Sequence, residues 1–362
     1  SVLYLEILTI KVFLLVSIHK TDWLIREATE DDFTEIRNLY HLVWGHLRPE
    51  KYDRWRYFSS PLGPSQISLA VKQNRLVGAF MLGPVEMRIG NSIVKGAHAM
   101  DVMSHPDYVG RPVFIEAGKH CVESATANGF EIFYGFPNPL SFPGFVRRLN
   151  WDHTGDVTHW VRPIRPSGYS KVPAAFGPIA DYATHLLPKG RTRHFDIRIQ
   201  KLGANDLEPL IKIWRQRQKL CRVERNEAWF NWRYSSDTLS DYEWVCAYEN
   251  GDLQALAIWG IRSRKWGAIY DGRARLTELL GINPHALQAV LKTVIKRARY
   301  RKAILLETAM NPPGIEKILR RAGFYAHRRM PLIVRSLSNI NISANIHYHP
   351  NWQIYGGDVD TF

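Results

Sequence analysis

The sequence predicts an α/β protein built from two similar halves, each a mixed, mostly antiparallel sheet flanked by helices. Strand-like and helix-like runs alternate through the first half, and the same pattern resumes in the second. A stretch rich in Pro, Gly and Ser, residues 162–178, separates the halves as a linker would. Short motifs also recur at a nearly constant spacing, which indicates a tandem duplication.

Three pairs of motifs carry the predicted duplication. "YDRWRY" ends at Tyr57 and "WFNWRY" at Tyr234. "FPNP" contains Asn138 and "AMNP" contains Asn311, while "RRLNW" and "RRAGF" follow these motifs in the same order. The second and third pairs share one spacing, and the first pair is only slightly wider. The alternative is that common helix endings recur by chance.

The motif spacing and the linker set the expected boundaries. We expect an N-terminal extension over 1–22, a first domain over 23–165, a linker over 166–192, and a second domain with its tail over 193–362. The extension is apolar, but its unbroken part is too short to span a bilayer and no signal-peptide pattern is visible. A strand or helix packed on the body, or an upstream segment, is therefore favoured over a membrane anchor.

The elements of the first half follow in order. "WLIREATEDDFTEIRNLYHLVW" predicts a strand and then a helix with Thr29 as its N-cap. Three short strands follow, with hairpin turns at Asn74 and at Gly90-Asn91. After the loop "SHPDYVGRPVF" (104–114) we expect a helix over 115–127, a strand in "FEIFYGFPN", a short helix in "SFPGFVRRLNW" and a last strand in "DHTGDVTHWVRPI". "DIRIQKLGANDLEPLIKIWRQR" restarts the strand–helix pattern in the second half.

Composition narrows the class of protein. The net charge of +14 fits a solvated basic surface, attraction to a small anion such as a phosphorylated cofactor, or affinity for nucleic acid or an acidic membrane. Neither zinc-finger spacing nor an RNA-binding aromatic signature accompanies the basic stretches, which argues against nucleic acid. Three widely separated cysteines fit neither a disulfide framework nor a paired-cysteine metal site. We therefore expect a cytoplasmic protein without a metal, and the sequence carries no signal for an oligomeric state.

The loop at 104–114 is the candidate anion site. A glycine-bearing turn between a strand and a helix can hold a phosphate, because the first N–H groups of a helix have no partner inside it. Gly110 and Arg111 suit this role, whereas Pro112 has no N–H. The loop is therefore a working anion cradle, a damaged one or only a turn.

The order of elements, with this loop after the fourth strand, resembles the GNAT superfamily of acyl-CoA-dependent N-acyltransferases. "DVMSHPDYVGRPVF" is similar to the family's strand followed by Arg-Gly-x-Gly-x-Gly/Ala, and "NPLSFPGFVRRLNW" is similar to its Asn-led helix that ends in Leu-Gly-Phe. The resemblance covers about residues 23–165, and 193–335 looks like a divergent repeat. It implies acetyl-CoA or another acyl-CoA as cosubstrate.

The loop departs from the family motif. Val109 stands in place of the first Arg or Gln, Pro112 replaces a glycine and Phe114 replaces the last small residue. The amides of Gly110, Arg111, Val113 and Phe114 and the Arg111 side chain remain as candidate phosphate contacts. Losing one donor weakens CoA binding without abolishing it. The equivalent turn of the second half, "ELLGINPHALQ", lacks the Arg-Gly pair, so we expect it not to bind CoA.

The resemblance also places the cosubstrate's reactive end. Backbone N–H groups at Val102, Met103 and Ser104, at the end of the fourth strand, would polarise the thioester carbonyl. Asn138, at the end of the next strand, would hydrogen-bond the pantetheine amides; the alternative is a turn residue before Pro139.

Proton transfer has several candidates. Asp101 and His105 flank the strand end and are the leading candidate bases, although each suits a purely local role in a turn or loop. Glu86 and His98, on neighbouring strands, are weaker candidates. The family's usual acid, a tyrosine, is replaced here by Val146.

The thiolate would then leave unaided or with help from Tyr134 or Ser141. Trp55-Arg56-Tyr57 and its echo Trp232-Arg233-Tyr234 would line an acceptor groove or pack the first helices. The aromatic, acidic tail is expected to fold back over the cleft, with Asp358 and Asp360 near a cationic acceptor.

The predicted function is transfer of an acyl group, with acetyl favoured, from acyl-CoA to a small amine such as an amino sugar or amino acid. The alternative is a non-catalytic GNAT-like protein that binds acyl-CoA or a partner. A nucleic-acid-associated protein is disfavoured, and so is a membrane protein.

Overall fold

The computed structural model describes residues 22–169, 171–188, 194–216, 221–235, 238–262, 272–281, 283–337 and 345–359. Nearly all of the predicted N-terminal extension therefore lies outside the described residues. Within the described ranges, no helix is both long and apolar enough to cross a bilayer.

The first half follows the predicted order of elements, except for an additional helix, Glu50–Phe58, before the three strands. Thr29 is the N-cap of a short 3₁₀ turn, Glu30–Asp32, that leads into the predicted helix, and Thr29 N donates to Asp32 Oδ2 at 2.8 Å; Asp32 is the N-cap of the helix itself. Both predicted hairpin turns are present: Asn74 (φ 61°) joins β2 to β3, and Gly90 (φ 59°) joins β3 to β4. The elements are β1 (Leu24–Glu27), α2 (Phe33–Trp44), α3 (Glu50–Phe58), β2 (Gln66–Lys72), β3 (Arg75–Ile89), β4 (Ser92–Ser104), α4 (Val113–Ala127), β5 (Ile132–Gly135), α5 (Phe142–Arg148) and β6 (Asp152–Pro163).

The second half repeats this order, with one additional short strand, β8. Its elements are β7 (Asp196–Ile199), α7 (Ala204–Gln216), β8 (Arg222–Val223), α8 (Glu227–Arg233), β9 (Ser240–Glu249), β10 (Asp252–Arg262), β11 (Arg273–Gly281), α9 (Pro284–Tyr300), β12 (Leu305–Ala309), α10 (Ile315–Arg321) and β13 (Tyr325–Ser336). A C-terminal segment with a short 3₁₀ turn at Gly356–Asp358 completes the chain.

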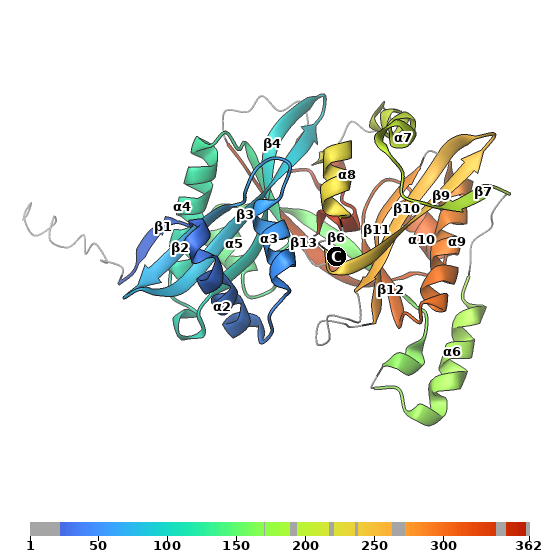
Figure 1. The fold of residues 1–362 in the computed structure, drawn as a ribbon, viewed down its shortest axis with the longest axis horizontal. Helices are drawn as coiled ribbons and strands as arrows, with labels where there is room; N and C mark the ends of the chain where they lie inside the picture. The colour runs from blue at the N-terminus through green and yellow to red at the C-terminus, as the bar shows by residue number, and fades with distance from the viewer. Residues whose placement is uncertain are drawn as a thin grey trace, which may run out of the picture.

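A single sheet runs through both halves (Figure 1). Its order is β1-β2-β3-β4-β5-β13-β6-β12-β11-β10-β9-β7, and β8 adds a short pairing with β3. The last strands of the halves are exchanged: β13 pairs with β5, and β6 pairs with β12. The expectation that each half builds a sheet of its own is therefore wrong. Motif spacing places β6 with the first half in sequence, but only tertiary pairing decides which strand it joins.

The order of antiparallel and parallel strand pairings is the same from either end of the sheet. Each half has three antiparallel pairings, then one parallel pairing (β4 with β5, β11 with β12), then an antiparallel pairing to the exchanged strand. The antiparallel pair β6–β13 joins the two arrays at the centre. The halves thus share one topology, and we propose that they arose by duplication of one unit. The predicted domain boundaries stay part of that proposal.

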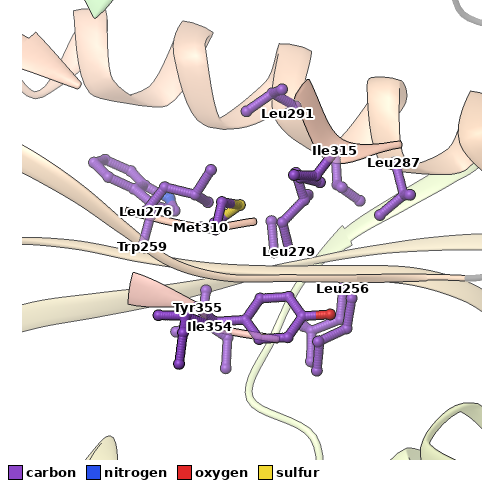
Figure 2. Packing of buried hydrophobic residues seen from close by; sticks show 14 of the residues in the cluster. Leu256, Trp259, Leu276, Leu279, Leu287, Leu291, Met310, Ile315, Ile354 and Tyr355 are labelled. Atoms are coloured by element: carbon purple, nitrogen blue, oxygen red, sulfur yellow. The ribbon is translucent and has the colours of Figure 1, made fainter. Parts of the chain in front are cut away.

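Helices cover both faces of the sheet and build separate cores. In the first half, α2 and α3 pack on one face around Met81 and Met103, while α4 and α5 pack on the other around Phe80 and Phe133. In the second half, Leu287 and Leu291 of α9 lie on one face, and Ile354 and Tyr355 of the C-terminal segment lie on the opposite face (Figure 2).

The segment predicted as a linker contains a helix that the sequence analysis missed. Helix α6 (Gly177–Leu186) lies below the body of the second half (Figure 1). Thr184 of α6 holds it in place by donating its hydroxyl to Ile164 O at 3.1 Å. Pro, Gly and Ser suggested irregular chain, yet Pro178 lies in the first turn of α6, where a proline is tolerated.

Candidate functional site

An open cleft lies where strands β4 and β5 part. The two strands pair in parallel from Gly96–Ile132 to Ala99–Gly135. Beyond Ala99, β4 continues to Ser104 without a described partner on that side. The cleft between the separated ends has a volume of about 750 Å³. We call it the outer cleft.

Residues from both halves line the outer cleft. Asp101 and Val102 come from β4, and Asn138 and Ser141 follow β5. The exchanged strand β13 adds Arg328 and Arg329, both exposed, together with Met330 and Pro331. The sequence analysis missed this contribution, because only the strand exchange brings residues near 330 beside β5.

Strand β4 bulges at the cleft. Met81 pairs with Met100 and Ala79 with Met103, so two β4 residues lie opposite one β3 residue. Asp101, one of the two, has φ 44°, in the left-handed region that few residues other than glycine adopt. The bulge turns the β4 backbone at the point where the cleft opens.

The Asp101 carboxylate is enclosed by donors. Arg48 Nη2 and Arg56 Nε each donate to its Oδ2 at 2.8 Å, and the Tyr57 hydroxyl donates to the same oxygen at 3.0 Å. Burial by itself would raise the pKa of Asp101, but the charges of Arg48 and Arg56 outweigh it and the pKa lies below its usual value. Asp101 therefore stays ionised and is a weak proton acceptor.

His105 lies away from the outer cleft. Its side chain is buried, its Nδ1 accepts from Asp107 N at 3.2 Å, and its Nε2 contacts the Arg75 guanidinium. Local partners thus occupy both ring nitrogens. Of the two leading candidate bases, only Asp101 lines the cleft.

The loop before α4 keeps part of an anion cradle. Gly110 has φ 83° and open space where a Cβ would lie. Among the described residues, the N–H groups of Gly110, Val113 and Phe114 donate to no other backbone group, as expected next to a helix start. The N–H groups of Val109 and Arg111 are already used, by Pro106 O at 3.3 Å and by Tyr108 O at 3.1 Å.

Of the residues predicted to bind the cosubstrate, some line the outer cleft and others do not. The Arg111 guanidinium is exposed and lies 5.1 Å from the Tyr108 ring centre. Asn138 caps its own turn, as its Oδ1 accepts from Leu140 N and Ser141 N at 3.0 Å each. Val102 and Asn138 line the outer cleft, whereas the residues Met103, Ser104, Gly110, Arg111, Val113 and Phe114 do not.

A second, inner cavity of about 70 Å³ lies between the two halves. Met100 lines both the inner cavity and the outer cleft, so the two spaces lie on either side of this residue, next to the β4 bulge. The predicted acceptor residues Trp55, Arg56, Trp232 and Arg233 all line the inner cavity. Trp55 and Trp232 stack on each other, with ring centres 5.0 Å apart.

His98 presents a nitrogen without a hydrogen-bond partner in this region. It lines the inner cavity, is 8% exposed, and its Nε2 is buried with no partner among the described residues. Its ring stacks on Tyr134 at 4.7 Å, which fixes the ring plane. Burial, followed by the positive charge of Arg56, lowers the pKa of His98 to about 3. The ring is therefore neutral near neutral pH.

The second half repeats the Asp101 cluster at the equivalent positions. Arg225, Tyr234 and Glu278 follow Arg48, Tyr57 and Asp101 at one constant spacing along the chain. Arg225 Nη2 and the Tyr234 hydroxyl donate to Glu278 Oε1, each at 2.9 Å. The motif echo at Tyr57 and Tyr234 was visible in the sequence, but their shared bonding to an acid was not.

The C-terminal segment fills the second cleft. Strands β11 and β12 pair from Arg273–Leu305 to Arg275–Glu307 and then part. Beyond that point, Asn311 N donates to Ile354 O at 3.1 Å, and Ile354 N donates to Asn311 Oδ1 at 2.8 Å. Residues 352–359 are all buried. The tail thus folds back as expected, but into the second cleft.

The acid predicted to meet a cationic acceptor is already paired. Asp358 lines the inner cavity, and Arg225 Nη1 donates to its Oδ1 at 2.6 Å. Asp360 lies outside the described residues.

Comparison with known proteins adds a family and a fold. Residues 24–154 match the family model of the acetyltransferase (GNAT) domain. No curated protein sequence matches the chain. A GCN5-related N-acetyltransferase from Anabaena variabilis ATCC 29413 superposes with a TM-score of 0.60 at 10% identity. One from Kribbella flavida superposes with 0.59 at 15% identity, and each comparison covers 87% of this chain and 72% of the other. At these identities the likeness concerns the fold.

Proposed function

Residues 24–154 belong to the GNAT superfamily, and on that premise we propose that the protein transfers an acyl group, with acetyl favoured, from acyl-CoA to a small amine. The amine's nitrogen attacks the thioester carbonyl carbon, the C–N bond forms, the C–S bond breaks and CoA leaves as its thiol. An amino sugar or an amino acid is the acceptor class that the sequence analysis favours.

One observation carries this proposal: the outer cleft and the inner cavity lie close together, since Met100 lines both. Acyl-CoA in the outer cleft would bring its thioester to the β4 bulge, and the amine would arrive from the inner cavity. The β4 edge beyond Ala99 has no described strand on the β5 side. Its N–H groups, at or near Val102 to Ser104, would then polarise the carbonyl.

The residues present fit the charged parts of CoA. The N–H groups of Gly110, Val113 and Phe114 would meet phosphate at the start of α4. Arg111 beside this turn and the exchanged-strand residue Arg328 in the outer cleft add exposed positive charge. The basic composition of the chain then serves binding of an anionic cosubstrate.

The second cleft takes no CoA under this proposal, because the C-terminal segment fills it. We therefore expect one CoA per chain. Isothermal titration measures this ratio directly, and a ratio of two would contradict the assignment.

Arg111→Glu tests the cofactor site. Lost charge-assisted bonds and added repulsion should weaken CoA binding by about 1 kcal/mol or more, roughly fivefold. Lys119→Glu, on the exposed side of α4, makes the same charge change and serves as the control. Equal affinities of the two variants would place the phosphates elsewhere.

A non-catalytic acyl-CoA-binding protein is the second candidate, and specific observations favour it. The amides of Val109 and Arg111 bond inward, and two arginines hold Asp101 as an ionised, weak base. Release of CoA thiol across a panel of amines and acyl-CoAs separates the candidates. A melting temperature that rises with CoA, with no thiol release from any pair, would select the binding protein.

A further inference from the structure

We propose that His98 is the proton acceptor of the acyl transfer, taking a proton from the acceptor amine through Nε2. This inference rests on the proposed acyltransferase function and names the base that neither Asp101 nor His105 supplies. Four features of the described residues carry it: place, orientation, a missing partner and protonation state.

The first feature is the place of His98, which lies on β4 shortly before the bulge. His98 pairs with Tyr134 one rung before the last β4–β5 pair, Ala99–Gly135. It stands two residues before Met100, which lines both the outer cleft and the inner cavity. At about 3.3 Å per residue along a strand, His98 lies roughly 7 Å from the bulge, about the reach of a small amine.

The orientation of the ring is fixed by its neighbours. Tyr134 stacks flat against it at an interplanar angle of 10°, and Phe136 meets it edge-on at 6.0 Å between ring centres. Tyr134 is itself held, because its hydroxyl donates to Asp358 O at 3.1 Å. The tail in the second cleft therefore supports a ring that lines the inner cavity.

The missing partner is the strongest sign of a ligand. Buried side-chain nitrogens nearly always have a hydrogen-bond partner, because an unpaired one costs about 1–3 kcal/mol. Nε2 of His98 has none among the described residues, and His98 lines a cavity. An amine N–H seated there would satisfy it.

The protonation state suits the role. The charged groups that act on His98 are Arg56 from α3, Asp101 from β4 and Arg233 from α8. Two positive charges and burial keep the ring neutral before the amine arrives, but they also oppose its protonation, so Nε2 can hold the proton only transiently. The amine loses one proton to Nε2 as the C–N bond forms, and Nε2 passes that proton to the departing thiolate, so the protons balance.

The test compares His98→Gln with His120→Gln. His120 is a partly buried histidine on α4 whose Nδ1 lies 2.8 Å from Ser68 Oγ, and it lines neither space. We expect His98→Gln to lower kcat about a hundredfold, with CoA affinity unchanged and His120→Gln near the native rate. In His98→Gly, added imidazole should restore turnover, a rescue that a structural role would not show.

The outcomes separate the two proposals. Native turnover with an unaffected His98→Gln, or with a change in KM alone, overturns the role of His98 and leaves the acyltransferase standing. No imidazole rescue of a correctly folded His98→Gly also overturns it. Absence of native turnover with every acyl-CoA and amine pair overturns the acyltransferase function, and the role of His98 falls with it.

Discussion

The two clefts of this sheet are built alike but occupied differently. In the first half, β4 and β5 part around open space, and Asn138 at the end of β5 accepts hydrogen bonds from its own turn. In the second half, β11 and β12 part around the protein's own tail, and Asn311 exchanges two hydrogen bonds with Ile354. One architecture thus provides a binding site in one copy and a packed core in the other.

The polar clusters behind the clefts show the same divergence. Asp101 receives two guanidinium groups, from Arg48 and Arg56. Glu278 shares Arg225 with a second acid, Asp358, which the tail brings in. Burial, helped by Asp358, raises the pKa of Glu278, whereas the pKa of Asp101 is lowered. The equivalent acids Asp101 and Glu278 therefore have pKa values shifted in opposite directions, and Asp358 of the tail contributes to this difference.

The largest expected effect comes from removing the shared arginine. Arg225→Met leaves Glu278 and Asp358 buried without their cation, so we expect a loss of about 3–5 kcal/mol in the free energy of unfolding. Arg48→Met should cost about 1–3 kcal/mol, since Asp101 keeps Arg56 and Asp53 keeps Arg37. Urea unfolding measures both, and equal losses would contradict the difference between the clusters.

Truncating one tail side chain tests how firmly the second cleft is filled. Ile354 is fully buried, so Ile354→Ala should cost about 2–5 kcal/mol. Val102→Ala, at the open cleft, should cost under about 1 kcal/mol because Val102 is only partly buried. Thermal unfolding of both variants gives the comparison, and a tail that merely rests on the surface would show two small effects.

The opposite pKa shifts predict opposite pH dependences. The folded pKa of Glu278 lies above its usual 4.5. Its contribution to the free energy of unfolding is therefore fully present below pH 4.5 and is lost as pH rises through the raised pKa. The folded pKa of Asp101 lies below 3.8, so its contribution is present above pH 3.8 and is lost in stronger acid. Glu278→Gln should flatten the stability profile toward neutral pH by about 1–3 kcal/mol, and Asp101→Asn should flatten it only in acid.

The smallest expected effect concerns the paired asparagines. Asn311→Ala leaves Ile354 N–H without an acceptor and should cost about 1–2 kcal/mol of stability without changing CoA affinity. Asn138→Ala should cost about 0.5–1 kcal/mol and lower CoA affinity through loss of the side-chain amide in the outer cleft. If a titration shows that Asn311→Ala weakens CoA binding more than Asn138→Ala, CoA binds in the second cleft and not in the outer cleft.

Local signals in the sequence predicted much of the first half correctly. Thr29, Asn74 and Gly90 specify a cap and two turns through their own backbone and side chains, and the structure has all three. The GNAT resemblance rested on the order of elements, the loop around Gly110 and Arg111 and the helix that follows Asn138, and the family match to residues 24–154 confirms it for the first half. Periodicity and turn chemistry act over a few residues, so a single sequence suffices to read them.

Only the tertiary structure decided how these parts combine. Nothing local in the sequence tells β6 to join β12, the tail to enter the second cleft, or Arg48 to meet the distant Asp101. The tertiary structure also places His98 beside a cavity and brings His105 into contact with Arg75. Such contacts depend on pairing and burial among distant segments, and the sequence by itself determined only the elements that take part in them.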